Sequence, residues 1–218
     1  MSFNIAIDGP AGAGKSTIAK QLAKELSFIY VDTGAMYRSM ALYFMRNGIA
    51  KEDEAAISDA CKTVEVSIAY ENGEQQVLLN GENVSKEIRK EEVGKMASAT
   101  SVYKEVRKKL VELQQKLAAD KDVIMDGRDI GTNILPNADV KIYLTASVKT
   151  RADRRYKELT EKGISCSYEE IAEDIKKRDE RDMSRETAPL KQAEDAILID
   201  SSDMSIEEVV HAICRQCK

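Results

Sequence analysis

Residues 9 to 16 read Gly-Pro-Ala-Gly-Ala-Gly-Lys-Ser, and they match the phosphate-binding loop pattern G-x-x-x-x-G-K-[ST] at every fixed position. Before this loop, the segment 4–8 carries Ile5 and Ile7 between short residues, which is typical of a buried strand. After the loop, the segment 17–26 places apolar residues at helical spacing. Strand, loop and helix therefore occur in the order that a nucleoside triphosphate site of this kind requires.

Each residue type in the loop has a physical reason to be there. Glycine lets the backbone turn its N–H groups inward, and the N-terminus of the following helix adds partial positive charge. Lys15 is expected to reach the outer phosphates and Ser16 to ligate Mg²⁺, which is the predicted cofactor. The predicted triphosphate contacts are Gly9, Pro10, Ala11, Gly12, Ala13, Gly14, Lys15, Ser16 and Thr17. The alternative is an ordinary glycine-rich turn between a strand and a helix, which the flanking context argues against.

The chain has 218 residues, enough for one core domain with an insertion or a mobile subdomain. Hydrophobic residues make up 43% and charged residues 33%, and no apolar run approaches the roughly 18 residues of a membrane span. No secretory signal pattern opens the chain, so a cytoplasmic protein without a membrane partner is expected. The net charge of −5 argues against a broad nucleic-acid surface, so an anionic substrate needs local clusters of Arg and Lys. The four cysteines are scattered, and we expect reduced thiols.

Four further segments have the composition of buried strands, and helical patterns separate them. They lie at residues 28–31, 123–125, 140–144 and 196–199. Helices between strands imply right-handed crossovers, so the predicted fold is α/β, a P-loop fold with a five-stranded parallel sheet flanked by helices. Residues 64–84 break this rhythm, because two alternating runs with turns at Asn72-Gly73 and Asn80-Gly81 predict a small antiparallel β insertion.

Polar side chains follow two of the predicted strands directly. Asp32, Thr33 and Arg38 come after the second strand, and Arg128 precedes Asp129 in the turn after the third. In open α/β sheets ligands bind beyond the carboxyl ends of the strands, so these groups are site candidates. The planar guanidinium of an Arg in such a turn can donate two parallel hydrogen bonds to a phosphate. The alternatives stay open, because the acids can be helix caps or turn formers and Arg38 a solvated helix residue.

Two segments carry dense charge. In the helix predicted from Val102, a narrow apolar stripe leaves Arg107 on another face, where exposure to solvent is the default. The arm between the fourth and fifth strands, residues 147–185, carries arginines on two helices whose apolar sides are thin, which predicts a loosely docked, mobile helical hairpin. Salt bridges along solvated helices would explain its charges. Alternatively, the arm closes arginines over the triphosphate and excludes water, as phosphoryl transfer demands.

Taken together, these strings resemble the nucleoside monophosphate kinases, and within them the bacterial cytidylate kinases. The matching pieces span nearly the whole chain and lie at 9–16, 32–38, 64–84, 126–131 and 178–185. The loop alone specifies a very large superfamily, whereas D-T-G-A-M-Y-R and D-G-R-D-I-G together are far more specific. The resemblance implies one P-loop kinase domain over 1–218, whose parts are a core at 1–34, 120–150 and 186–218, a monophosphate-binding subdomain with the β insertion at 35–119, and a helical lid at 151–185.

The resemblance also implies a role for individual residues. Arg38, Arg128 and Arg185 would hold the acceptor phosphate, and Asp182 the sugar hydroxyls. Ser98, Arg107 and Asp129 would face the base, and Thr33 supplies a hydroxyl where a family member can carry Ser. Arg154 would join the ATP contacts. The implied catalytic residues are Lys15, Arg128, Arg178, Arg181 and Arg185.

The implied activity is transfer of the γ-phosphoryl group of MgATP to CMP or dCMP, giving CDP or dCDP and ADP, by a monomer in pyrimidine nucleotide metabolism. Charge positioning would suffice, without a covalent intermediate. The alternatives are a P-loop kinase of UMP or of a small metabolite, such as a sugar or a shikimate-like acid, and a nucleotide-dependent switch. The arginines on the acceptor side favour a phosphorylated acceptor, and the sequence contains no N-K-x-D guanine-specificity string, which weakens a GTPase switch.

Overall fold

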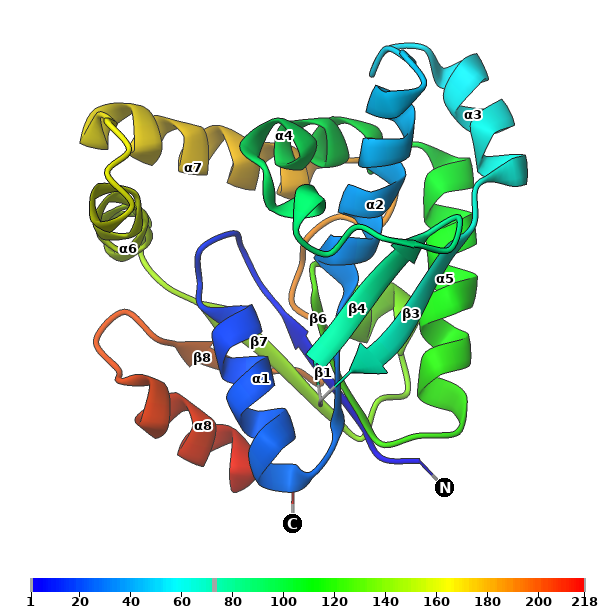
Figure 1. The fold of residues 1–218 in the computed structure, drawn as a ribbon. Helices are drawn as coiled ribbons and strands as arrows, with labels where there is room; N and C mark the ends of the chain where they lie inside the picture. Colours follow the sequence, from blue (N-terminus) through cyan, green and yellow to red (C-terminus); the bar gives the residue numbers. More distant parts are fainter. Residues whose placement is uncertain (1, 72–73, 218) are drawn as a thin grey trace. The chain divides into compact units, whose positions relative to one another are not determined.

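The computed structural model describes residues 2–71 and 74–217, and the chain divides into two compact units (Figure 1). Unit 1 contains Ile29–Lys121 together with Ser2, and unit 2 contains Phe3–Phe28 together with 122–217. The turn predicted at Asn72-Gly73 lies outside the described residues.

Unit 2 is built on four strands, which are β1 (Asn4–Asp8), β6 (Val123–Gly127), β7 (Val140–Thr145) and β8 (Ile197–Asp200). Strand β1 pairs in parallel with β6 and with β7, and β7 pairs in parallel with β8. Because β1 and β6 are almost wholly buried, their sequences are continuous apolar runs that end in an acid or a glycine, as is usual for central parallel strands. The larger sheet has the order β2-β6-β1-β7-β8, so the predicted five-stranded parallel sheet is confirmed.

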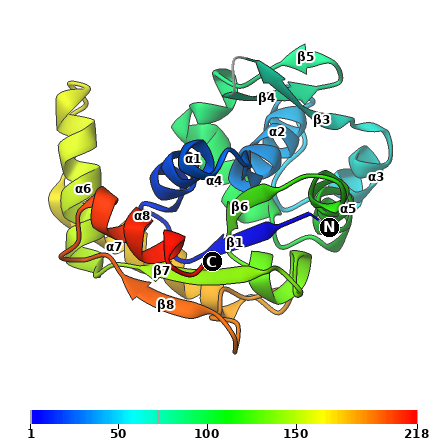
Figure 2. The same cartoon turned by 90° about the horizontal axis from the view of Figure 1, so that it is seen from below.

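The helices of unit 2 are α1 (Lys15–Leu26), α6 (Val148–Glu161), α7 (Tyr168–Ser184) and α8 (Ile206–Cys214), with a π-helical turn η2 (Ile130–Ile134) after β6. Helices α1 and α8 lie side by side on one face of the strands (Figure 2). Helices α6 and α7 pack on each other through Ala152, Leu159 and Ile171. The hydroxyls of Ser147, Ser167 and Ser205 cap α6, α7 and α8 by accepting from backbone N–H groups of the first helical turn.

Unit 1 holds strand β2 (Ile29–Asp32), helices α2 (Thr33–Arg46), α3 (Glu54–Thr63), α4 (Glu91–Thr100) and α5 (Lys104–Ala119), and a 3₁₀ turn η1 (Glu87–Arg89). The β insertion is confirmed as an antiparallel sheet of β3 (Val66–Glu71), β4 (Glu74–Leu79) and a third short strand, β5 (Glu82–Asn83). Gln75 ties this sheet to the end of β2. Its side-chain oxygen accepts from the Asp32 N–H at 2.9 Å, and its amide nitrogen donates to the Asp32 carbonyl at 3.3 Å.

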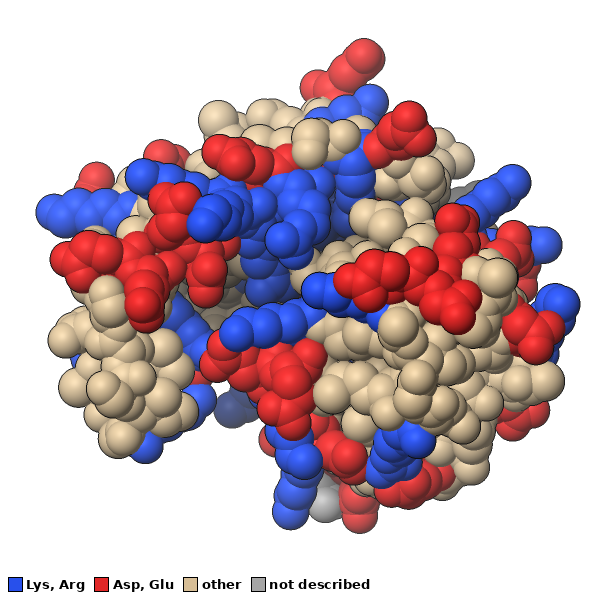
Figure 3. Space-filling model, turned by 90° about the horizontal axis from the view of Figure 1, so that it is seen from above, with Lys and Arg blue, Asp and Glu red and all other residues tan. Residues whose placement is uncertain are grey.

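The surface carries charges of both signs. Figure 3 shows Lys and Arg side chains interspersed with Asp and Glu on the face seen from above. Within residues 2–71 and 74–217, no helix is both long and apolar enough to cross a membrane. All four cysteines are free thiols, as expected.

Candidate active site

The phosphate loop of unit 2 is tightly constrained by its glycines. Gly9 has φ of +149°, and a Cβ built there would lie 1.9 Å from the Leu144 carbonyl oxygen of β7, so no other residue fits. Gly14 is the N-cap of α1 and is left-handed, with φ of +89°. The loop therefore runs directly against the sheet and turns sharply into the N-terminus of α1, where the helix dipole favours an anion.

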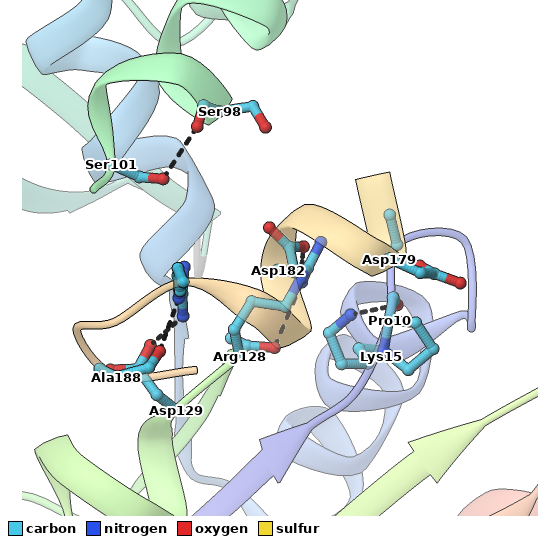
Figure 4. Close-up of polar contacts among 12 residues, drawn as sticks. Pro10, Lys15, Ser98, Ser101, Arg128, Asp129, Asp179, Asp182 and Ala188 are labelled. Atoms are coloured by element: carbon cyan, nitrogen blue, oxygen red, sulfur yellow. Dashed lines mark hydrogen bonds and ion pairs between the residues drawn. The ribbon is translucent and has the colours of Figure 1, made fainter. Parts of the chain in front are cut away.

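Lys15 is buried under this loop. Its Nζ donates to the Pro10 carbonyl at 2.8 Å (Figure 4), and only 6% of the residue is exposed. Burial and the Arg128 guanidinium lower the pKa of Lys15. The ammonium thus lies where cations already repel one another, and a bound polyphosphate would relieve that repulsion.

Ser16 makes a contact that defines a possible Mg²⁺ position. Its hydroxyl donates to Oδ2 of Asp126 at 2.9 Å, and Asp126 is buried near the end of β6. A hydroxyl and a carboxylate are the hard oxygen ligands that Mg²⁺ prefers, and Mg²⁺ commonly takes its other ligands from water and substrate phosphates. The loop pattern predicted Ser16 alone as a metal ligand. The sequence feature that could have identified Asp126 is its place directly after the buried strand residues 123–125.

Asp8 is a second buried carboxylate, at the end of β1. Its two oxygens accept from the Ile130 N–H at 2.8 Å and the Gly131 N–H at 2.7 Å. It therefore fixes the start of the turn that follows Arg128 and Asp129. Burial raises the pKa of Asp8 to about 6, although the hydrogen bonds from the Ile130 and Gly131 N–H groups act to lower it.

This shift predicts a pH-dependent stability. Because the native state holds the Asp8 proton more tightly than the unfolded chain, the stabilising contribution is full below its ordinary pKa of 3.8 and is lost as the pH rises to about 6. Between pH 3.8 and pH 6, we expect the free energy of urea unfolding of the wild type to fall by about 3 kcal/mol relative to that of Asp8→Asn. A wild-type-to-variant difference that stays constant from pH 4 to pH 7 would show that Asp8 titrates normally.

In unit 2, the two arginines expected to hold the acceptor phosphate, Arg128 and Arg185, are each paired with a carboxylate. Arg128 Nε donates to Oδ2 of Asp182 at 2.8 Å (Figure 4), and Arg185 Nη2 donates to Oδ1 of Asp129 at 3.2 Å. Burial acts to raise the pKa of Asp182, but the hydrogen bond from Arg128 and the charges of Arg128, Arg178 and Arg185 together hold the pKa below its usual value. Asn133 donates to the other Asp129 oxygen at 3.1 Å, so Asp129 is an ion-pair partner as well as a turn residue.

The arginines of α7 differ in their surroundings. The charge of Arg178 contributes to the lowered pKa of Lys15, so Arg178 lies near the phosphate loop. Arg181, one turn further along, is exposed. Of these two arginines, Arg178 is therefore the one whose charge acts on the lysine of the phosphate loop.

Arg154 of α6 also lies beside the phosphate loop. Its Nη2 donates to the Ser201 carbonyl at 2.8 Å, and a Cβ built on Gly14 would lie 3.8 Å from Nη1. Ser201 follows β8, and its hydroxyl bonds the Ala13 carbonyl at 3.4 Å. Ser201 was not predicted as a site residue, because one Ser after a strand carries no distinctive pattern.

The charges on the outer parts of the α6–α7 arm form surface salt bridges. Arg155 pairs with Glu158 at 2.9 Å, and Lys177 approaches Glu173 at 3.5 Å. These exposed pairs bear out the solvated-helix interpretation for that part of the arm.

Four predicted acceptor residues belong to unit 1. Thr33 is buried at the start of α2, where the Asp32 carboxylate caps the helix by accepting from the Ala35 N–H at 2.9 Å. The capping interpretation of Asp32 is therefore confirmed. Arg38 donates to the Ile88 carbonyl at 3.1 Å, so its guanidinium is held rather than loose in solvent.

Arg107 differs from the expectation of solvent exposure. It is only 4% exposed, its Nη1 donates to the Ser101 carbonyl at 3.3 Å, and its guanidinium carbon lies 5.8 Å from the centroid of the Tyr37 ring. The Ser101 hydroxyl in turn donates to the Ser98 carbonyl at 3.1 Å (Figure 4). The default of a solvated Arg107 was therefore wrong, because the helix packs that side chain as well as its apolar stripe.

Comparison with known proteins gives the family. A family model described as cytidylate kinase matches residues 5–218. The chain belongs to the cytidylate kinase family. It is 52% identical to a protein named cytidylate kinase from Caldicellulosiruptor bescii, over 97% of this chain and 93% of that relative. It is 50% identical to the one from Carboxydothermus hydrogenoformans, over 95% of this chain and 94% of that relative.

Solved structures show the same fold at low sequence identity. An uncharacterized protein from Eubacterium ventriosum aligns with a TM-score of 0.52 and 14% identity, over 99% of this cytidylate kinase family member and 97% of that chain. A gluconokinase from Sinorhizobium meliloti 1021 aligns with a TM-score of 0.50 and 12% identity, over 99% of this chain and 91% of that chain. At such identity the likeness extends to the fold alone.

Proposed function

We propose that this protein transfers the γ-phosphoryl group of MgATP to CMP or dCMP, giving ADP and CDP or dCDP. The observation that carries the proposal is the group of cations in unit 2. Arg128 and Arg178 both act to lower the pKa of the buried Lys15, so the charge of an arginine expected on the acceptor side reaches the lysine expected on the donor side. A cluster of cations of this kind can offset the repulsion between two phosphate groups that must approach each other for transfer.

In this proposal the protein contributes positioning and charge. Lys15, Arg128 and Arg178 neutralise the developing charge on the transferring group, and the aligned substrates need no covalent intermediate. Ser16 and Asp126 would hold Mg²⁺, which supplies further neutralisation of the phosphate oxygens when it is bound with ATP. Asp182 and Asp129 hold the guanidinium groups of Arg128 and Arg185, which would bind the acceptor phosphate.

The remaining roles are assigned by the same family resemblance. The loop residues Gly9 to Thr17 and Arg154 bind ATP, Thr33 and Arg38 act on the acceptor, and Ser98, Arg107 and Asp129 read the base. Asp182 faces the sugar hydroxyls, and Arg181 and Arg185 assist transfer. We further propose that the protein works as a monomer in the cytoplasm, with residues 35–119 as the acceptor subdomain and 151–185 as the lid.

A coupled assay of ADP formation tests the proposal. With saturating MgATP we expect CMP and dCMP to support turnover, and UMP, AMP, GMP, gluconate and shikimate to support little. Turnover with a non-nucleotide acceptor but not with CMP would overturn the assignment. ADP formation at the same rate with and without any acceptor would instead indicate a nucleotide-hydrolysing switch.

The lid proposal predicts a change in backbone protection. Residues 168–178 of α7 should exchange amide hydrogens more slowly when a bisubstrate analogue is bound, because its phosphates supply partners for the arm's arginines. Hydrogen exchange measured by mass spectrometry gives the comparison, and α8 serves as the internal reference. Equal protection of residues 168–178 in both states would count against a lid.

Gly94 of α4 gives a selective test of Arg38. A Cβ built on Gly94 would lie 2.8 Å from Arg38 Nη1 and 2.9 Å from Nη2, so Gly94→Ala should displace the guanidinium. We expect the KM for CMP to rise about tenfold, since a charge-assisted hydrogen bond is weakened. The Tm should not fall, because Ala favours a helix interior by about 1 kcal/mol over Gly.

The control for this prediction is the Arg38→Ala background. If Gly94→Ala acts only through Arg38, adding it to Arg38→Ala leaves the KM for CMP unchanged within twofold. A normal KM in the single variant Gly94→Ala would show that Arg38 does not hold the acceptor from this position.

A further inference from the structure

Arg151 is a buried arginine in an arm that carries many exposed charges. It lies in the first turn of α6 and is only 4% exposed. Its guanidinium donates to the two oxygens of Asp179 at 3.0 and 2.6 Å. Its Nε donates to the Ala146 carbonyl at 2.9 Å, and its Nη1 also donates to the Ala11 carbonyl at 3.1 Å.

These bonds join three separate segments of unit 2. Ala146 precedes α6, Asp179 belongs to α7, and Ala11 belongs to the phosphate loop. The aliphatic part of Arg151 also lies against the loop, since a Cβ built on Gly12 would be 3.4 Å from Arg151 Cβ. One side chain thus fixes the spacing between α7 and the loop that is expected to grip the triphosphate.

Helix α7 carries groups whose placement matters for transfer. Arg178 is the immediate neighbour of Asp179, and its charge reaches Lys15. Asp182, one turn further, pairs with Arg128 at 2.8 Å. Two ion pairs one turn apart therefore hold this helix, and Arg178 lies directly beside the first of them.

A contribution to stability alone does not explain this arrangement. Buried ion pairs contribute little net stability compared with well-packed apolar residues, because both charges lose their water. A bidentate pair does fix the relative direction and distance of its two side chains, since two parallel hydrogen bonds from a planar guanidinium allow few alternative geometries. In phosphoryl transfer, a displacement of about 1 Å can cost on the order of a hundredfold in rate.

We propose that Arg151 and Asp179 are positioning residues, which set Arg178 against the phosphate loop during phosphoryl transfer. This role rests on the proposed kinase function. The pair itself contacts neither substrate. It acts through Arg178.

The first test is Arg151→Lys, which keeps the charge and loses the bidentate geometry. We expect kcat at saturating MgATP and CMP to fall at least about tenfold, with the KM for CMP within threefold of wild type. Asp179→Asn, which keeps the shape of the side chain, should give the same pattern and serves if Arg151→Lys does not fold. The matched controls are Arg155→Lys and Glu158→Gln, which alter an exposed pair on the same helix and should leave kcat within twofold.

The deciding measurement combines Arg151→Lys with Arg178→Met. If Arg151 acts by placing Arg178, then in the Arg178→Met background Arg151→Lys lowers kcat less than twofold, because the group it positions is gone. A merely structural role predicts that the two losses multiply, and that result would overturn the proposal. An unchanged kcat in Arg151→Lys would overturn it too. If wild type itself shows no CMP-dependent turnover, the proposed function fails and the role of the pair fails with it.

Discussion

In the Lys15→Met variant, we expect kcat to fall by about a thousandfold while the protein stays folded. The substitution removes a cation from the outer phosphates at the point where charge develops in the transition state, and losses of single groups of this kind are typically this large. Stability should change little. Lys15 is buried and its pKa is lowered, so the folded protein already holds its ammonium at a cost, which partly offsets the lost bond to the Pro10 carbonyl.

Lys24→Met is the matched control for this experiment. Lys24 lies on the same helix α1 and is exposed, so its removal should leave both kcat and Tm near wild type. A rate for Lys15→Met within tenfold of wild type, about 1.4 kcal/mol, would show that Lys15 does not contact the transferring phosphate.

The second large effect concerns the choice of base. We expect the wild type to prefer CMP over UMP by roughly a hundredfold in kcat/KM, because each mispaired buried polar group costs on the order of 1–3 kcal/mol. Cytosine offers an amino donor that Asp129 or Ser98 can accept, and N3 and O2 acceptors toward which Arg107 can donate. Uracil presents a carbonyl oxygen and an N–H at the first two of these positions. The burial of Arg107 supports this prediction, because a buried guanidinium depends strongly on its partners.

The test compares CMP and UMP in Arg107→Met and in Asp129→Asn. We expect the ratio of kcat/KM to fall at least about tenfold in each variant. Asp129→Asn is preferable to a truncation, because Asp129 also holds Arg185 and Asn133, and an amide of the same shape disturbs them less. Any effect through Arg185 on the phosphate is common to both acceptors and cancels in the ratio. Lys108→Met is the exposed control, and an unchanged ratio in both test variants would refute the base-reading assignment.

The sequence predicts the sheet and the phosphate loop well, because both depend on local patterns. The loop has fixed spacing, and the buried strands are continuous apolar runs between helical segments. Strand β5 was not predicted, since a two-residue strand has no periodicity. Arg107 was expected in solvent, because helical spacing shows which residues share a face but not how wide the packed face is.

Contacts between distant charged residues could not be predicted. Arg151 and Asp179 lie 28 positions apart on two helices whose composition resembles a solvated surface, and nothing local marks them as buried. The amide contacts of Asp8 likewise join β1 to a turn 122 residues later. The role of Gly94 beside Arg38 depends on how α4 packs on α2, which a single sequence does not reveal.

The fate of the γ-phosphoryl group of ATP tests the proposed transfer to CMP. The protein is incubated with CMP and with ATP labelled at its γ-phosphate, and the labelled products are separated. We predict that the label moves into CDP, in equal amount to the ADP formed. Label recovered only as inorganic phosphate, at the same rate with and without CMP, would refute phosphoryl transfer to CMP.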